Sequence, residues 1–152
     1  MRFGKKTLLA AGVAAAFVAS VSGALAQQKP EETLKMRQGL MQAVKMQAGP
    51  LLGFAQGKND LPADAQIRGE NLAALAKISP IAWAPGSENL EGNKTKADAY
   101  GSADFAKGWQ VMAIASTNLA SAAKTGNADL IKGAAGELGR TCKGCHDNFK
   151  KD

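Results

Sequence analysis

The stretch from Asn127 to Phe149, NADLIKGAAGELGRTCKGCHDNF, carries the pattern from which the fold is predicted. Its apolar side chains recur every three or four residues, which is the spacing of one face of an α-helix. Asn127 is a favourable N-cap, and Asp129 places a carboxylate in the first turn, where the positive end of a helix favours it. The predicted inward face consists of Ile131, Ala135, Leu138, Cys142, Cys145 and Phe149.

Three upstream segments show the same helical periodicity, over about 31–56, about 62–79 and 102–126. Pro50 is expected to kink or locally break the first helix, because proline lacks an N–H and its ring clashes with the preceding turn. The predicted inward faces are Leu34, Met41, Val44, Ala48, Leu51 and Ala55 in the first segment, Ile67, Asn71, Ala74, Leu75 and Ile78 in the second, and Phe105, Trp109, Met112, Ser116, Leu119 and Ala123 in the third.

The connection over 79–101 is expected to be irregular, because it is rich in proline, glycine and asparagine. A loop of this length in a compact domain often has a functional role. No segment shows the two-residue alternation of a strand, and no Asn-Gly or Asp-Gly pair joins two strand-like runs. Four helices with two short connections and one long connection predict an all-α fold, an antiparallel four-helix bundle.

The N-terminal residues 1–26 have the three-part pattern of a secretory signal peptide. Residues 1–6 are basic, 7–28 carry no charge, and Ala24-Leu25-Ala26 fits the small-x-small cleavage rule. The alternative is a retained membrane anchor, since about 20 apolar residues can span a bilayer. Cleavage after Ala26 would leave one domain, 27–152, in the bacterial periplasm, with no second apolar run that would insert into a membrane.

The charge balance argues against nucleic-acid binding. The chain has 19 Lys and Arg against 13 Asp and Glu, but three of the basic residues lie in the predicted signal peptide. Removing them leaves 16 basic and 13 acidic residues, a net charge of +3. Such a mildly basic domain lacks the dense positive surface that phosphate backbones require.

Cys142-Lys143-Gly144-Cys145-His146 is a C-x-x-C-H sequence, the attachment signal for c-type haem. Positions i, i+3 and i+4 share one face of a helix. Both thiols can therefore add to the two vinyl groups of a haem while the imidazole reaches the iron from the same side. A secretory signal agrees with this chemistry, because bacterial haem c is attached outside the cytoplasm.

Three other uses of these residues are less favoured by the pattern. A structural zinc site normally takes four protein ligands, and two cysteines with the only histidine leave it one short. A redox-active C-x-x-C belongs near a strand–helix junction, not inside the last helix of an all-helical chain. A plain disulfide between i and i+3 would leave His146 without a role. The glycines inside this segment, Gly133, Gly136 and Gly139, are expected to let a flat group lie close to the helix.

The chain resembles cytochrome c′, the high-spin class II c-type cytochromes of bacterial periplasms. The resemblance covers essentially all of 29–152. Its haem motif lies within a few residues of the C-terminus, whereas mitochondrial-type cytochromes c carry it near the N-terminus. The other matching stretches are Lys29-Pro30-Glu31-Glu32, Met36-Arg37-Gln38-Gly39-Leu40-Met41 and Trp83-Ala84-Pro85-Gly86.

The resemblance implies one haem c in the bundle core, bound covalently through Cys142 and Cys145. His146 matches the proximal axial ligand of the iron. Met41 matches the distal position, usually an apolar residue that shields a vacant coordination site. Low-spin relatives of the same class use a methionine there as the sixth ligand, so the two mechanisms diverge at Met41.

The resemblance also assigns four residues around the haem. Arg37 and Gln38 match a pair beside the haem propionates. Trp83 matches an aromatic residue that packs on the haem, and Thr95 lies in the loop expected to close over the haem edge. Lys150 stands one turn after His146, where the family often has arginine.

These assignments predict a five-coordinate haem protein that transfers electrons and binds small diatomic gases such as nitric oxide and carbon monoxide. The alternative is a low-spin electron carrier in which Met41 saturates the iron. No nucleophile–base pair or carboxylate dyad indicates an enzyme, and the sequence names no redox partner protein. A second apolar stripe in the first helix, Met36, Leu40 and Ala43, predicts a homodimer through the first two helices, and the family is commonly dimeric.

Overall fold

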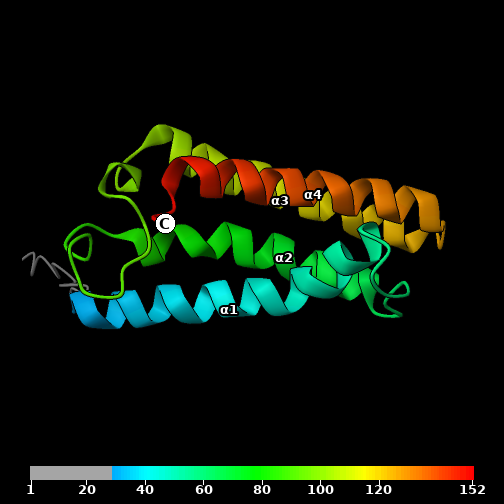
Figure 1. The fold of residues 1–152 in the computed structure, drawn as a ribbon, viewed down its shortest axis with the longest axis horizontal. Coiled ribbons are helices and arrows are strands. Elements are labelled where there is room, and N and C mark those ends of the chain that lie inside the picture. The colour runs from blue at the N-terminus through cyan, green and yellow to red at the C-terminus, as the bar shows by residue number, and fades with distance from the viewer. Residues whose placement is uncertain (1–28) are drawn as a thin grey trace, which may run out of the picture.

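A computed structural model describes residues 29–152, and the predicted signal peptide lies outside the described residues. Four helices, α1 (Pro30–Ala55), α2 (Ala65–Ile78), α3 (Ala103–Lys124) and α4 (Ala128–Phe149), run alternately up and down, side by side (Figure 1). Within residues 29–152 no strand forms. The all-α prediction of an antiparallel four-helix bundle is therefore confirmed.

Local sequence signals set the ends of α3 and α4. The Ser102 hydroxyl accepts a hydrogen bond from the Phe105 N–H at 3.2 Å, and the Asn127 side-chain oxygen accepts from the N–H groups of Asp129 and Leu130 at 3.0 and 3.1 Å. Each cap satisfies donors that the first turn leaves free. Gly126 follows α3 with a φ of 68°, a conformation that glycine adopts without strain.

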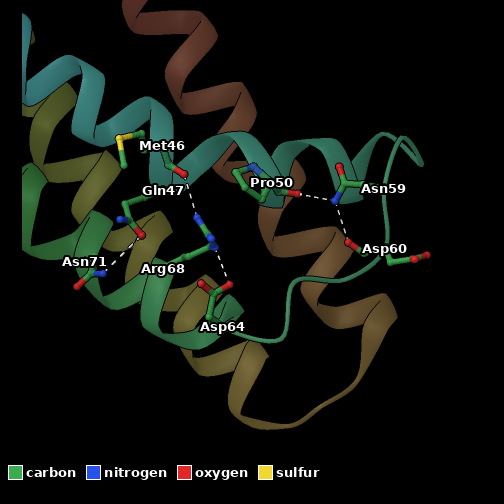
Figure 2. Close-up of polar contacts among 8 residues, drawn as sticks. All are labelled: Met46, Gln47, Pro50, Asn59, Asp60, Asp64, Arg68 and Asn71. Carbon is green, nitrogen blue, oxygen red and sulfur yellow. Dashed lines mark hydrogen bonds and ion pairs between the residues drawn. The ribbon is translucent and has the colours of Figure 1, made fainter.

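Pro50 lies inside α1, which continues as one helix to Ala55 and bends in its last turns (Figure 1). The expected kink is present, but the helix does not break. Proline has no N–H to offer the carbonyl four residues earlier, that of Met46. Figure 2 shows the replacement donor: Arg68 of α2 donates from Nη1 to the Met46 carbonyl at 2.9 Å, while its Nε pairs with Asp64 at 2.6 Å.

A second polar contact secures the bent end of α1. The Asn59 side-chain amide donates to the carbonyl of Pro50 at 3.0 Å and to that of Asp60 at 2.8 Å (Figure 2). The same side chain lies against Gly53, where an added Cβ would meet it at 2.0 Å. The turn after α1 is thus folded back on the helix by side-chain amide hydrogen bonds.

The predicted inward face of α2 is wrong. Ile67 and Ile78 are 58% and 52% exposed, whereas the buried side of α2 consists of Ala65, Gly69, Leu72, Ala73 and Ala76. The physical reason is the close approach of α2 to α3. A Cβ on Gly69 would lie 2.8 Å from the backbone nitrogen of Ala120, so the side of α2 that carries glycine faces α3 at this crossing. The faces predicted for α1 and α3 do contribute the main buried side chains of those helices.

We predict that Arg68→Met costs about 0.5–1 kcal/mol of unfolding free energy, because it removes the donor that serves the Met46 carbonyl in place of a proline N–H. In a Pro50→Ala background the cost falls, since the introduced alanine supplies the missing backbone N–H. Urea unfolding of the wild type, the two single variants and the double variant measures the coupling free energy between Arg68 and Pro50. Arg140→Met, which removes an exposed arginine paired with Glu137 on α4, is the control and leaves stability unchanged. An equal cost for Arg68→Met in both backgrounds would contradict the explanation.

Candidate functional site

A cavity of about 570 Å³ lies within the bundle and is walled by α1, α3, α4 and the long loop after α2. Cys142, Cys145 and His146 line it from one face of α4. The walls are mainly apolar and include Leu34, Val44, Leu52, Phe105, Met112 and Phe149. A mostly apolar cavity with a few converging polar groups is the usual form of a cofactor site.

The two cysteines of the motif are free thiols, each half-buried. Burial raises the pKa of both Cys142 and Cys145, and the neighbouring thiol adds to the rise at Cys142. Within the described residues no three acidic, cysteine or histidine side chains gather as a metal site would require. Both thiols lie on the cavity side of α4.

His146 lies at the edge of the same cavity, on the last turns of α4. Desolvation lowers its imidazole pKa, and the positive charge of Lys150 lowers it further. A lowered pKa favours the neutral imidazole, which is the form that binds a metal. Two thiols and a neutral imidazole on one face of a helix, beside an apolar space, fit a haem that is held through two thioether bonds and one iron bond.

Arg37 of α1 is buried and attaches the long loop to the bundle. Its Nε donates to the Ala82 carbonyl at 3.0 Å, Nη1 to the Asn93 side chain at 2.7 Å and Nη2 to the Ser87 hydroxyl at 2.6 Å. Each of the three guanidinium nitrogens therefore has a partner in the segment from 82 to 93. Arg37 also lines the cavity, as the propionate prediction requires, and its hydrogen bonds show a structural role that the sequence did not reveal.

Two aromatic rings flank the Arg37 guanidinium. The ring centres of Trp83 and Tyr100 lie 5.3 and 5.2 Å from its central carbon, within the range of cation–π attraction. Burial lowers the pKa of Arg37, but an arginine keeps its charge at any physiological pH. The charge is thus held between two rings and three loop oxygens.

Trp83 and Thr95, predicted from the resemblance to lie near the haem, both line the cavity. The indole N–H of Trp83 donates to the Thr95 hydroxyl at 3.0 Å. The Trp83 ring also packs at 5.1 Å from Trp109 and 5.5 Å from Phe105, which form part of the α3 wall. Gln38 and Met41 of α1 complete the predicted set, and all eight predicted residues line this one cavity.

Asn93 is a residue that the sequence did not single out. Besides accepting from Arg37, its side-chain oxygen accepts from the Thr95 N–H at 3.0 Å, and its amide donates to the carbonyls of Glu88 and Thr95. It therefore ties the loop to itself as well as to α1. A lone asparagine in a loop rich in turn residues carries no sequence signal that would distinguish it from its neighbours.

The interpretation of the α4 glycines is wrong. Gly133, Gly136 and Gly139 do not line the cavity, and a Cβ on Gly139 would instead meet the Leu52 side chain at 3.2 Å. The glycines that line it are Gly49, Gly92 and Gly108, on α1, the loop and α3. Space for a flat group is therefore left by the other walls, while α4 contributes the reactive side chains.

The long loop ends by pairing with the chain that follows α4. Thr95 and Lys150 form an isolated antiparallel bridge, supported by hydrogen bonds from the Lys96 N–H to the Phe149 carbonyl and from the Lys151 N–H to the Lys94 carbonyl. Figure 1 shows this loop beside the end of α4 near the C-terminus. The pairing closes the cavity beside His146.

The family model for cytochrome c′ matches residues 32–150. The chain belongs to the cytochrome c′ family. Cytochrome c′ of Rubrivivax gelatinosus is 35% identical over an alignment of 128 positions that covers 82% of this chain and 98% of that protein. A cytochrome c-554 of Cereibacter sphaeroides is 33% identical over 142 residues, covering 84% of this chain and 88% of its own.

Solved structures agree with this assignment. Cytochrome c′ of Shewanella frigidimarina has a TM-score of 0.75 at 30% identity, covering 82% of this chain and 98% of its own. A variant from Alcaligenes xylosoxidans in the ferrous state with bound nitric oxide has a TM-score of 0.71 at 28% identity, with the same coverage. The cofactor of this family is a covalent haem c, and Cys142 and Cys145 are the two cysteines that this chain offers for it.

We predict that Arg37→Met costs about 2–4 kcal/mol, because it leaves several buried loop acceptors without donors. Arg37→Lys restores little, since an ammonium cannot reproduce the three-way fork of the guanidinium. The control is Gln38→Met, which changes the exposed neighbour of Arg37 on α1; this side chain also lines the cavity. Chemical unfolding gives the energies, and faster limited proteolysis within 84–100 locates the loosened segment. A full rescue by Arg37→Lys would show that charge alone holds the loop.

Proposed function

We propose that this cytochrome c′ binds nitric oxide and carbon monoxide and carries electrons, using His146 as the axial iron ligand and Met41 as an unbonded cover of the other coordination site. The observation that carries the proposal is that His146 of α4 and Met41 of α1 line the same cavity. When bound, the haem supplies an iron that accepts one electron and one diatomic ligand. Relatives of known structure include forms with bound nitric oxide and bound carbon monoxide.

The side chains that line the cavity determine which small molecules can bind to the iron. The neutral imidazole of His146 is the form that donates to iron, and the fall of its pKa on burial supports that form. The half-buried thioether of Met41, with Leu34 and Val44 nearby in the cavity wall, makes the space apolar. Uncharged diatomic gases lose little hydration there, whereas anions and water would lose strong hydrogen bonds.

Met41→Ala tests the open site. We expect the variant to bind carbon monoxide about tenfold faster or more, because a steric cover is removed. The spectrum of the protein without ligand should remain high-spin. Flash photolysis measures the binding rate, and absorption spectra report the spin state. Met112→Ala, which truncates a methionine of the α3 wall, is the matched control for a general loosening of the cavity.

The second candidate function is a pure electron carrier in which Met41 ligates the iron. The same position of Met41 in the cavity favours it. In that case the wild-type protein is low-spin, and Met41→Ala converts it to high-spin. The two functions thus give opposite spectra for the wild-type protein.

We place the protein in the bacterial periplasm. The support is the predicted signal peptide over residues 1–26 together with a haem type that bacteria attach outside the cytoplasm. Within the described part of the chain, no helix has the length and apolar character needed to cross a membrane. Cleavage after Ala26 would release 27–152 as a single haem-binding domain.

We also propose a homodimer through α1 and α2. Met36 and Leu40, part of the apolar stripe predicted for this contact, are half-buried against the core of the same chain. The free apolar side chains on these two helices are instead Met46, Ile67 and Ile78, which are all more than half exposed. An isologous contact would bury them against their copies.

Ile67→Glu tests the dimer without disturbing the core, because the side chain is exposed in one chain. We expect sedimentation to show a shift from dimer to monomer at micromolar concentration, since two carboxylates would meet in the contact. Ile114→Glu makes the same change at an exposed position of α3 and should leave the dimer intact. A dimer that tolerates Ile67→Glu but not Ile114→Glu would move the interface to α3.

A further inference from the structure

Four lysines come together where the long loop pairs with the segment after α4. The backbone hydrogen bonds that join 94–96 to 149–151 place Lys94 and Lys96 beside Lys150 and Lys151. Lys94 and Lys150 also line the cavity, as does Lys45 of α1. We call these five residues, Lys45, Lys94, Lys96, Lys150 and Lys151, the lysine rim.

The charges of the lysine rim are not neutralised within the described chain. None of the five ammonium groups forms an ion pair in residues 29–152. The carboxylate of Asp147 pairs with Lys143, so the acidic residues without an ion pair that lie nearest in sequence to the paired segments are Asp98 and Asp152. Four of the rim lysines are exposed, and the half-buried Lys96 donates to the carbonyl of Asn148 at the end of α4.

Placing like charges side by side on paired backbone segments costs stability. The hydrogen bond between Lys151 and Lys94 puts two such charges on directly paired residues. A positive field concentrated at one place attracts anions and orients charged partners as they approach. Here the positive field lies at the cavity proposed to hold the haem, since Lys45, Lys94 and Lys150 line that cavity.

We propose that the lysine rim is the docking surface for an acidic redox protein, which exchanges one electron with the haem from this side of the cavity. The inference rests on the proposed function, because it needs a redox-active haem in the cavity. In the exchange one electron moves between the haem of this chain and an oxidised or reduced centre of the partner, and no atom is transferred. Carboxylates of the partner would pair with the rim ammonium groups.

An acidic protein fits better than a membrane or a nucleic acid. The large exposed apolar side chains on the described surface lie on the four helices and on the 3-10 turn Ser79–Trp83, and not on the paired segments 94–96 and 149–151; the most exposed are Met46, Ile81 and Ile114. A lipid surface would therefore meet charge without an apolar anchor beside it. The rim contains neither arginine nor an exposed aromatic ring, the usual groups for reading or stacking nucleic-acid bases.

The test uses the haem-loaded protein and a charge reversal, Lys94→Glu with Lys151→Glu. Neither side chain donates a hydrogen bond within residues 29–152, and the pair keeps like charges opposite each other, so we expect the backbone bridge to be retained. The control, Lys58→Glu with Lys132→Glu, makes the same change in net charge on two exposed lysines at the far end of the bundle, where α1 ends and α4 begins.

The electrostatic field at the site of electron transfer is measured with two small oxidants of opposite charge. Stopped-flow kinetics follow the oxidation of the reduced protein by ferricyanide, an anion, and by tris(phenanthroline)cobalt(III), a cation. At about 10 mM ionic strength we expect the rim variant to react about tenfold more slowly with ferricyanide and faster with the cobalt complex. The control should change much less, and the differences should vanish near 1 M salt. Equal effects of rim and control variants would overturn the proposal, because net charge alone would then explain the rates.

Binding measurements identify the class of partner. The probes are a blue copper protein with an acidic surface, phosphatidylglycerol vesicles and a DNA duplex, each at low and high salt. Salt-sensitive binding of the copper protein that is lost only in the rim variant supports the proposal. If the rim is needed for binding vesicles or DNA and the copper protein does not bind, the proposal is overturned, and the partner is a membrane or a nucleic acid instead.

Haem content separates this inference from the proposed function. A pyridine haemochrome assay on all three proteins shows whether haem is attached, and a chain without covalent haem would refute the proposed function whatever the binding results. Normal haem content with no rim-dependent rate or binding would refute the docking surface alone. A loss of haem only in the rim variant would also overturn it, because the lysines would then serve to hold the cofactor.

Discussion

The arrangement of two thiols and one imidazole on a single face of α4 is the constraint on which the rest of the structure depends. Residues at i, i+3 and i+4 can act on one flat group only if the helix continues through all of them and faces an empty space. The N-cap of Asn127 and the buried side of Ile131, Ala135 and Leu138 hold the helix in that orientation. α1, α3 and the loop must therefore leave a cavity beside α4 where a bundle would otherwise pack closely.

The cavity stays open because its fourth wall is a loop that is fixed from inside the bundle. The guanidinium of Arg37 donates one hydrogen bond to each of three loop acceptors, and two aromatic rings flank its charge. The far end of the loop is fixed to the end of α4 by the Thr95–Lys150 bridge. The same loop thus positions Trp83 and Thr95 on the cavity, closes it beside His146 and brings the lysine rim together.

Sequence reasoning predicted the parts governed by local periodicity and by covalent chemistry. The four helices, their caps and the C-x-x-C-H face follow from spacing along one segment at a time, and the resemblance placed all eight predicted residues on one cavity. It failed where the outcome depends on how closely two helices approach. Gly69 against Ala120 turns the small side of α2 inward, so its isoleucines face outward, and Gly139 adapts α4 to Leu52 instead of to a cofactor.

Other features depend on contacts between residues far apart in sequence. The hydrogen bonds of Arg37 to Ser87 and Asn93 span 50 and 56 residues, and the donation of Arg68 to the carbonyl freed by Pro50 joins two helices. Periodicity within one segment carries no information about such pairs. The resemblance predicted correctly that Arg37 lies at the cavity, but it did not reveal that Arg37 holds the loop through three hydrogen bonds.

The resonance Raman spectrum of the purified ferrous protein shows whether Met41 leaves the iron open, since it reports the spin and coordination state of the haem iron without any substitution. We expect a five-coordinate, high-spin iron with an iron–histidine stretching band. A six-coordinate, low-spin spectrum without that band would contradict it, because a second protein ligand would then occupy the site proposed for nitric oxide and carbon monoxide.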